Sequence, residues 1–415
     1  IVFTQTSDNS GQFNIACRIE CWGDITFNCY VNVVSGSEVI AKGNINANGI
    51  FKGNKNKNGK TGLDISGTIY SVQNVNTLYP LKLQSGKLYC AGDLQAAQTD
   101  SIEFNEAVQI KGTSELYVTG IVNSGIERRF KLYSDNGEKG SIVSIFGLNG
   151  NSGGYINALS SNIDEFTNNQ PESRIYLGDG SIEQTATKSN LTFSKQFVND
   201  GSLYLYGSLS VSHNNIVGNN GGLTLIGGNL TMSSGAISLS NSHRLIVLGY
   251  LSSNDAVNLN SSSKLYVAKY ISINGLYGST ITLNDNSYII IGGSTQNYCS
   301  SIDINGGSKF WSLAPVWTTY VVNVESSSAD NLSEFFSNGK HTISQTDTAG
   351  KKTDVVINGL YIADNIGDKI LNSLTIKEFG NITHNGSLTV LSSLKVESGG
   401  YLCIKDEVQL GSVSA

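Results

Sequence analysis

The sequence is poor in charge and in proline. Charged side chains make up 14% of the 415 residues, and there are only 3 prolines and 1 methionine. This composition suits many short strands joined by turns and differs from that of a helix-rich cytosolic enzyme. The net charge of −6 is mild. Because no basic face emerges, we expect no nucleic-acid partner. No apolar run is long enough to span a membrane.

A repeated phrase dominates the region from Gly201 to Asn297. It reads GSLYLYGSLSVS at its first occurrence and returns four times with small variations. The first apolar residues of the five phrases lie 20, 22, 20 and 23 residues apart, at Leu203, Leu223, Leu245, Leu265 and Tyr288. A period of this length indicates a solenoid, in which each repeat packs against its neighbours.

Each repeat has room for three short strands. Apolar and polar residues alternate within it, which is the period of a strand with one face buried. Gly, Asn and Ser fill the corners, where tight or left-handed turns are needed. About 20 residues leave no room for crossover helices. We therefore predict an all-β fold, a right-handed parallel β-helix (β-solenoid) with three strands per rung of about 20–23 residues.

The outward positions of the first strand are unusual because they are apolar or aromatic, whereas those of the other two strands are polar. An exposed apolar stripe often marks a contact surface. The alternative is that these side chains only shield strand edges or lie beneath an insertion. The candidate interface residues are Tyr89, Tyr117, Tyr176, Tyr204, Ile246, Tyr266 and Ile289.

Residues 1–45 differ from the repeats. Alternating apolar residues run up to Cys21 and resume at Ile25 after Trp22-Gly23-Asp24, which predicts a β-hairpin cap turning at Gly23. That hairpin would place Cys17 opposite Cys29, our disulfide candidate in an oxidising compartment. The alternative is that these cysteines are small hydrophobic residues of the cap. The spacing disfavours zinc, and we predict no metal or cofactor.

The remaining chain divides into three segments. We predict solenoid rungs over 46–314, a lateral insertion over 315–370 where the period fails, and further rungs over 371–415, in which Leu374, Leu388 and Leu402 recur at intervals of 14. Cys403 falls on the outward face there and joins the interface candidates. The coil is still winding at the last residues, so either the chain is a fragment or another subunit covers this end.

An extracellular or cell-surface location is expected. The chain begins at Ile1 and not at Met, which suggests that a signal peptide has been removed. Several sequons arise by chance in a chain so rich in Asn and Ser. The N-x-S/T glycosylation candidates are Asn190, Asn229, Asn260, Asn331, Asn381 and Asn385.

The rung length and strand pattern over Leu81 to Leu410 resemble those of parallel β-helix surface proteins. These include adhesin-type passengers, phage tailspikes, and polysaccharide lyases and hydrolases. The resemblance extends to architecture alone. No paired carboxylates of a glycosidase and no Ser/His/Asp arrangement stand out, so we predict no catalytic residues.

The predicted function is that of a non-catalytic structural protein. We expect it to self-associate into a fibre, sheath or surface layer through the apolar/Tyr ladder and the solenoid ends. Its partners would be copies of itself or a companion surface protein. One alternative is an adhesin that binds glycans, and a second is a β-helix polysaccharide lyase, hydrolase or tailspike.

Overall fold

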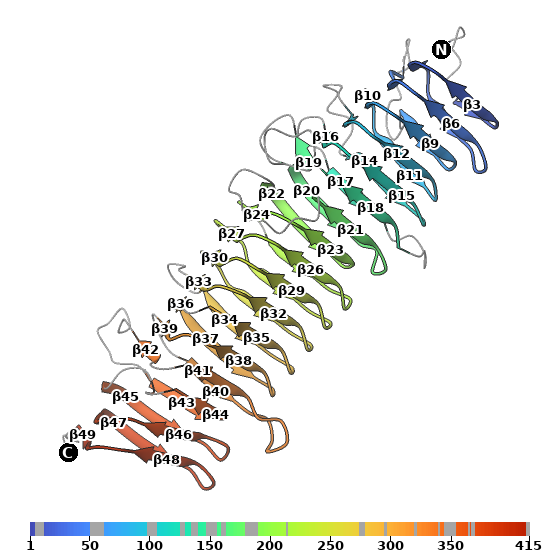
Figure 1. Cartoon of the computed structure of the whole chain (residues 1–415). Helices are drawn as coiled ribbons and strands as arrows, with labels where there is room; N and C mark the ends of the chain where they lie inside the picture. Colours follow the sequence, from blue (N-terminus) through green and yellow to red (C-terminus); the bar gives the residue numbers. More distant parts are fainter. Residues whose placement is uncertain are drawn as a thin grey trace, which may run out of the picture. The chain divides into compact units, whose positions relative to one another are not determined.

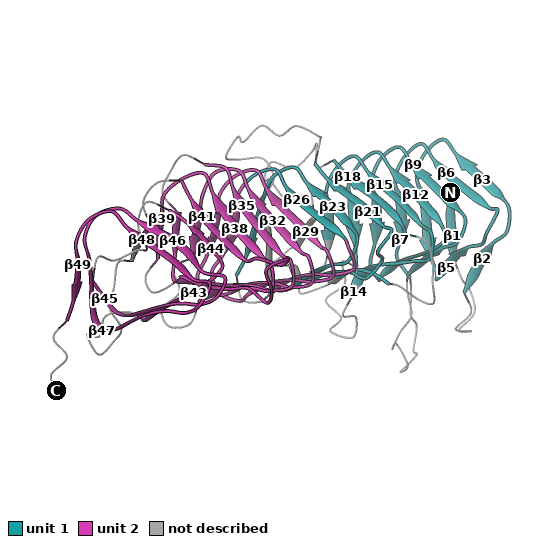
Figure 2. Cartoon of the chain, turned by 90° about the horizontal axis from the view of Figure 1, so that it is seen from below, with its two compact units in different colours: residues 1–214, 222–228 teal, residues 215–221, 229–415 magenta. Residues whose placement is uncertain are grey.

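The structure, a computed structural model, consists of stacked parallel strands (Figure 1). Every regular element among the described residues is a strand. The chain forms two compact units, 1–214 with 222–228 and 215–221 with 229–415 (Figure 2). The described residues are 1–4, 12–49, 62–97, 106–124, 129–133, 140–146, 156–158, 163–178, 190–212, 215–273, 279–293, 297–318, 322–338, 341–343, 354–363, 366 and 370–411.

The first unit has three faces, named A, B and C in chain order. Face A comprises β1 (Val2–Thr4), β4 (Ile25–Asn28), β7 (Ile45–Ala47), β10 (Val75–Thr77), β13 (Leu94–Ala96), β16 (Val122–Ser124) and β19 (Ile156–Ala158). Face B comprises β2 (Phe13–Ile15), β5 (Val31–Val33), β8 (Leu63–Ile65), β11 (Leu81–Gln84), β14 (Glu106–Lys111), β17 (Arg129–Leu132), β20 (Ile163–Asn168) and β22 (Asn190–Asn199). The first half of β22 also pairs with β24 (Ser208–Val211).

Face C of the first unit is built from strands of four residues. It comprises β3 (Arg18–Cys21), β6 (Glu38–Ala41), β9 (Thr68–Ser71), β12 (Lys87–Cys90), β15 (Glu115–Val118), β18 (Ile142–Ile145), β21 (Arg174–Leu177), β23 (Ser202–Leu205) and β26 (Leu223–Ile226). Each strand pairs in parallel with the strand one rung further on, so that Leu88 lies beside Leu116 and Ile175 beside Leu203.

The second unit repeats this plan, and its faces are named in the same order. Face A comprises β27 (Leu230–Met232), β30 (Leu251–Ser253), β33 (Ile271–Ile273), β36 (Asn297–Cys299), β39 (Val316–Thr318), β42 (His341–Ile343) and β49 (Val408–Leu410). Face B comprises β25 (Ile216–Gly218), β28 (Ile237–Leu239), β31 (Val257–Leu259), β34 (Thr280–Leu283), β37 (Ser301–Asn305), β40 (Val322–Glu325), β43 (Asp354–Asn358), β45 (Ile370–Ile376) and β47 (Leu388–Val396). Face C comprises β29 (Arg244–Val247), β32 (Lys264–Val267), β35 (Tyr288–Ile291), β38 (Lys309–Ser312), β41 (Glu334–Ser337), β44 (Leu360–Ile362), β46 (Asn381–His384) and β48 (Tyr401–Ile404).

Inward side chains fill each coil as columns of like residues. Leu245, Leu265 and Ile289 are fully buried one above the other on face C of the second unit. In the first unit, Phe166 stacks on Phe197 with ring centroids 5.2 Å apart. This close packing of like against like is the main source of stability in a solenoid. The prediction of an all-β parallel solenoid is confirmed.

The corners before face C show why the turns are rich in Ser, Asn and Gly. In the second unit, Ser261 and Ser262 have φ of 52° and 64°, and Asp285 and Asn286 have φ of 54° and 61°. The residue after each such pair is a buried serine or, in one rung, His243. A pair of left-handed residues therefore turns the chain so that a small polar side chain points inward.

The predicted N-terminal hairpin is wrong. Phe13 pairs in parallel with Val31 and Ile25 with Ile45, so the turn at Gly23 is a corner of the coil and not a reversal. Local alternation reveals a strand but does not choose its partner, which here lies one rung away.

The predicted disulfide is wrong as well. Cys17 lies between β2 and β3, and Cys29 lies between β4 and β5, at different corners of the coil. Both thiols are free, Cys17 exposed and Cys29 buried. The pairing depended on the hairpin, and it fails with the hairpin.

The predicted lateral insertion over 315–370 is also wrong, because its described strands continue the coil. Trp317 pairs with Tyr298, Phe336 with Trp311, and Glu325 with Asn358, all in parallel. The apolar period fails because buried polar side chains take inward positions: Thr318, Ser326, Ser333, Ser337 and His341.

The rungs of 371–415 have a period of 20, not the predicted interval of 14. Leu374 pairs with Leu394, Ile382 with Leu402 and Leu388 with Val408, each partner 20 residues further on. The shorter interval compares residues of different faces: the first half of β47, with Leu388, pairs with β49 of face A, whereas Leu374 pairs with Leu394 in the second half of β47 on face B. The repeat that sets the stacking is therefore the same as in the preceding rungs.

Candidate functional site: an outward aromatic column on face C

Face C carries two outward columns, at the first and third positions of its four-residue strands. Residues at the second and fourth positions point inward, as in β12, where Leu88 is fully buried and Tyr89 is partly exposed. The third position of the first unit holds Tyr70, Tyr89, Tyr117, Ser144, Tyr176 and Tyr204 in consecutive rungs. We call the five tyrosines among these residues the aromatic column.

The rings of the aromatic column stack along the coil. Ring centroids are 4.8 Å apart for Tyr70 and Tyr89 with an interplanar angle of 8°, and 5.1 Å apart for Tyr89 and Tyr117 with an angle of 3°. Tyr176 and Tyr204 repeat the arrangement at 5.0 Å. These separations match the spacing of hydrogen-bonded strands, so the backbone fixes the rings in register.

This stacking decides which part of each ring is offered to a partner. Neighbouring rings cover each other's flat faces within a run, so ring edges and hydroxyl groups form the outward surface. A sugar that stacks on an aromatic residue needs a free ring face. The aromatic column is therefore better suited to another protein surface, in which aromatic edges and hydroxyls pack and hydrogen-bond.

Charged groups flank the rings at the first position of the same strands. Lys87 Nζ lies 2.7 Å from Glu115 Oε1, and the Tyr89 hydroxyl donates to Glu115 Oε2 at 2.7 Å. The hydrogen bond from Lys87 holds the pKa of Glu115 below its usual value, whereas burial and the bond to Glu115 raise the pKa of Tyr89. These bonds fix the orientation of the Tyr89 ring.

The second unit has a mixed apolar and aromatic column at the same position. Ile246 lies beside Tyr266, and Tyr266 beside Ile290. The predicted outward Ile289 is buried and lies beside Leu265. Because β35 contains three consecutive isoleucines, its sequence does not reveal which of them points outward. The pairing with β32 places Ile290 outward, beside Tyr266.

Sequence reasoning missed several members of the face C columns. Trp311 and Phe336 continue the mixed column in the rungs after Ile290. Lys309 Nζ lies over the Trp311 ring, 5.3 Å from the ring centroid. The same Nζ is 3.7 Å from Glu334 Oε2. The sequences KFWS of β38 and EFFS of β41 align with KLYV of β32. This alignment would have placed Trp311 and Phe336 at the outward third position.

Cys403 lies at the third position of β48, beside Thr383 of β46, and is partly exposed. It therefore points outward as predicted, although its neighbour in the stack is not one of the residues with which the interval of 14 aligned it.

A separate aromatic pair lies on face A of the second unit. Tyr298 and Trp317 are 45% and 37% exposed and meet edge to face, with centroids 6.0 Å apart. The sequence pattern gave no sign of this pair, because the preceding rungs have small polar residues at the same position, such as Ser252 and Ser272.

The sequons differ in how available their asparagines are. Asn381 and Asn385 are exposed. Asn260 accepts from Asn284 Nδ2 at 2.8 Å within an amide ladder, and Asn229 Oδ1 accepts from the Tyr250 amide at 3.1 Å. Asn331 donates to Ser327 Oγ at 3.4 Å. Asn190 begins β22.

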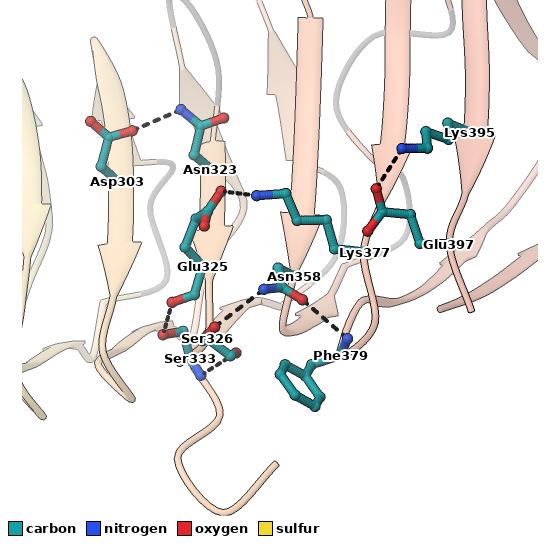
Figure 3. A network of polar contacts seen from close by, with 10 residues as sticks. All are labelled: Asp303, Asn323, Glu325, Ser326, Ser333, Asn358, Lys377, Phe379, Lys395 and Glu397. Carbon is teal, nitrogen blue, oxygen red and sulfur yellow. Dashed lines mark hydrogen bonds and ion pairs between the residues drawn. The ribbon is translucent and has the colours of Figure 1, made fainter. Parts of the chain in front are cut away.

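A polar network holds the rungs of the second unit together on face B (Figure 3). Lys377 Nζ lies 2.9 Å from Glu325 Oε1, and Asn323 donates to Asp303 Oδ1 at 2.9 Å. Asn358 donates to the Ser326 carbonyl and accepts from the Phe379 amide. Asp303 and Asn323 join successive strands, and the Lys377–Glu325 pair spans the rung of β43 that lies between them, so we assign the network to structure.

The described residues contain no group of three or more His, Cys, Asp or Glu side chains able to hold a metal ion. They also contain no helix long and apolar enough to cross a membrane.

Comparison with known proteins adds no family to this geometry. No family model matches the sequence, and neither the curated proteins nor the solved structures include a significant match.

Proposed function

We propose that this is a non-catalytic extracellular structural protein that self-associates into a fibre, sheath or surface layer through face C. The observation that carries the proposal is the aromatic column, whose tyrosines occupy five of six consecutive rungs and keep part of their surface in solvent. Stacking already orders these rings, so little side-chain entropy remains to be lost when a partner binds.

A repeated surface suits repeated contact. Five of the six rungs from Tyr70 to Tyr204 present a tyrosine at the same position, so a partner with the same period gains a contact at each of these rungs. Copies that meet through contacts that do not close on themselves build a filament or a layer. The stacked ring faces favour a protein partner over a glycan, which sets this proposal above the adhesin alternative.

The cysteines and sequons are compatible with an extracellular location. Cys29, Cys90 and Cys299 are buried, and burial raises the pKa of the Cys90 thiol to about 11. Thiols in this state resist oxidation. The exposed Asn381 and Asn385 are the sequons best placed to carry glycans.

The experiment compares assembly of the wild type with that of a Tyr89→Ser/Tyr117→Ser variant. Light scattering and negative-stain electron microscopy would follow the purified chain from about 1 μM to about 1 mM, a range that covers weak protein association. Tyr298→Ser, which removes an exposed tyrosine from face A, is the matched control. We expect the double variant to lose assembly and the control to retain it.

Two results would refute the proposal. One is a wild-type chain that stays monomeric over the whole concentration range. The other is a folded double variant, as judged by circular dichroism, that assembles as the wild type does.

A further inference from the structure

The first positions of face C in the first unit carry charges in an order that matches opposite signs when two copies lie face to face with their rungs in opposite order. We call these residues the charged column: Arg18, Glu38, Thr68, Lys87, Glu115, Ile142, Arg174, Ser202 and Leu223, each beside the next in the stack. Counted outward from the midpoint between Lys87 and Glu115, the positions form the pairs Lys87 with Glu115, Thr68 with Ile142, Glu38 with Arg174, and Arg18 with Ser202.

We propose that face C of the first unit packs against face C of a second copy about a two-fold axis parallel to the strands, between Lys87 and Glu115. This rests on the proposed function and specifies its face C contact. A two-fold contact closes on itself, so growth beyond the dimer would need a second contact, such as the solenoid ends. Such an axis reverses the order of the rungs and keeps first positions opposite first positions. Lys87 then faces Glu115 of the second copy, and Glu38 faces Arg174 of the second copy.

Arg174 supports this register. It is exposed and has no acidic partner among the described residues of its own chain, whereas Arg18 already pairs with Glu20 and Glu38 at 3.2 and 3.4 Å. A guanidinium with no acidic partner among the described residues is a suitable partner for a carboxylate on another molecule.

The third positions give independent support through shape. Under the same axis, Tyr70 faces Ser144 of the second copy, and Tyr89 faces Tyr117 of the second copy. Tyr70 is the most exposed ring of the aromatic column, at 39%, and Ser144 is 8% exposed where a tyrosine is missing. The most exposed ring therefore faces the small side chain of Ser144, which lies between Tyr117 and Tyr176 in the stack.

Other registers are poorer. Moving the axis by half a rung places Lys87 or Glu115 opposite itself. Moving it by a whole rung places Lys87 opposite Arg174, or Glu38 opposite Glu115. Like charges in such positions disfavour a complex.

Among the registers further away, only those centred on Thr68 and on Ile142 avoid like charges and also match opposite charges over more than two rungs. The first overlaps only the first five rungs, and the second matches only Glu115 with Arg174. The proposed register overlaps the first eight rungs, from β3 to β23.

The size of this contact predicts a weak complex. Eight rungs at ~4.8 Å and strands of ~13 Å give roughly 500 Å² per copy, or roughly 1,000 Å² in total. That lies at the low end of specific interfaces. We therefore expect a concentration-dependent dimer that is stabilised when repeated contacts add to it in a larger assembly.

A reciprocal charge exchange tests the register. Homodimers of Arg174→Glu place two Glu–Glu pairs at the interface, and homodimers of Glu38→Arg place two Arg–Arg pairs there. In an equimolar mixture, the heterodimer restores two opposite-charge pairs. We expect each variant alone to dimerise at least about tenfold more weakly than the wild type and the mixture to recover wild-type affinity.

Sedimentation velocity at about 50 mM salt, where screening is weak, would measure dimerisation, and energy transfer between labelled chains would detect the heterodimer. Lys82→Glu on face B makes the same change in net charge as Arg174→Glu and is the control. Variants that dimerise as the wild type does, or a mixture that fails to recover, would overturn the register. If the charge-exchange test fails but Tyr89→Ser/Tyr117→Ser abolishes assembly, the proposed function would stand without this two-fold register. A wild type that remains monomeric at every concentration would remove both.

Discussion

Acidification should destabilise the second unit through its buried histidines. His341 is 1% exposed; its Nε2 lies 2.9 Å from Thr318 Oγ1, and its Nδ1 is hydrogen-bonded to the Tyr361 hydroxyl. His243 is fully buried, and its Nδ1 lies 3.2 Å from the Asn219 carbonyl oxygen. Burial lowers the pKa of His341 to about 3 and that of His243 to about 4.

The magnitude follows from the difference between folded and unfolded pKa values. Both histidines are neutral in the folded unit at pH 5, whereas in the unfolded chain they take up protons below about pH 6.5. The unfolded state therefore binds more protons, and the free energy of unfolding falls as the pH drops through 6.5. At about pH 4.5 each histidine should have removed about 2.5 kcal/mol, and the loss levels off below the folded pKa values.

The assay compares wild type with His243→Ser. Serine is the natural choice because Ser263 and Ser287 occupy the same corner in the next rungs and are fully buried there. Urea unfolding at intervals between pH 7.5 and 4.5 gives the free energy of unfolding of each protein. The variant should be less stable at pH 7.5, because the space over Gly218 is emptied, yet lose less stability on acidification.

The quantity to compare is the difference in the free energy of unfolding between wild type and His243→Ser, since carboxylates contribute equally to both. We expect this difference to change by about 2.5 kcal/mol in favour of the variant between pH 7.5 and 4.5. A difference that stays constant with pH would refute the reasoning, because His243 would then bind its proton equally well in both states.

Two further predictions concern thiols and a corner glycine. Under native conditions a thiol reagent should label Cys17 rapidly and leave Cys299 unlabelled until unfolding, as read by mass spectrometry, because Cys17 is exposed and burial raises the pKa of the Cys299 thiol; rapid native labelling of Cys299 would contradict its placement in the core. Gly293→Ala should cost more than about 2 kcal/mol in urea unfolding, because its Cβ would lie 1.4 Å from the Lys269 carbonyl oxygen. Gly23→Ala, whose Cβ has no neighbour within 4 Å, is the control, and equal stability of the two variants would show that the corner can move.

Stacking also explains why the tyrosine positions were predictable and their partners were not. The Leu-Tyr phrases at Tyr89, Tyr117 and Tyr204 and the Ile-Tyr phrase at Tyr176 show by alternation alone that the ring points away from the core. Which rings stack depends on rung lengths, and these vary: Tyr117 lies 28 residues after Tyr89, yet the two strands are in register.

The sequence by itself determined the solenoid, the three strands per rung and the outward tyrosines, because period-2 alternation and a period near 20 are both local patterns. Only the tertiary structure decided which strands pair. It turned the supposed hairpin at Gly23 into a corner and separated Cys17 from Cys29. It set Ile290 and not Ile289 outward, and it showed that the described strands within 315–370 continue the coil. The physical reason is common to these cases. A hydrogen-bonded partner one rung away fixes the phase of a strand, and buried polar residues are accepted inside when a neighbouring rung supplies a hydrogen bond, as Gly307 does for Ser333 and Thr318 for His341.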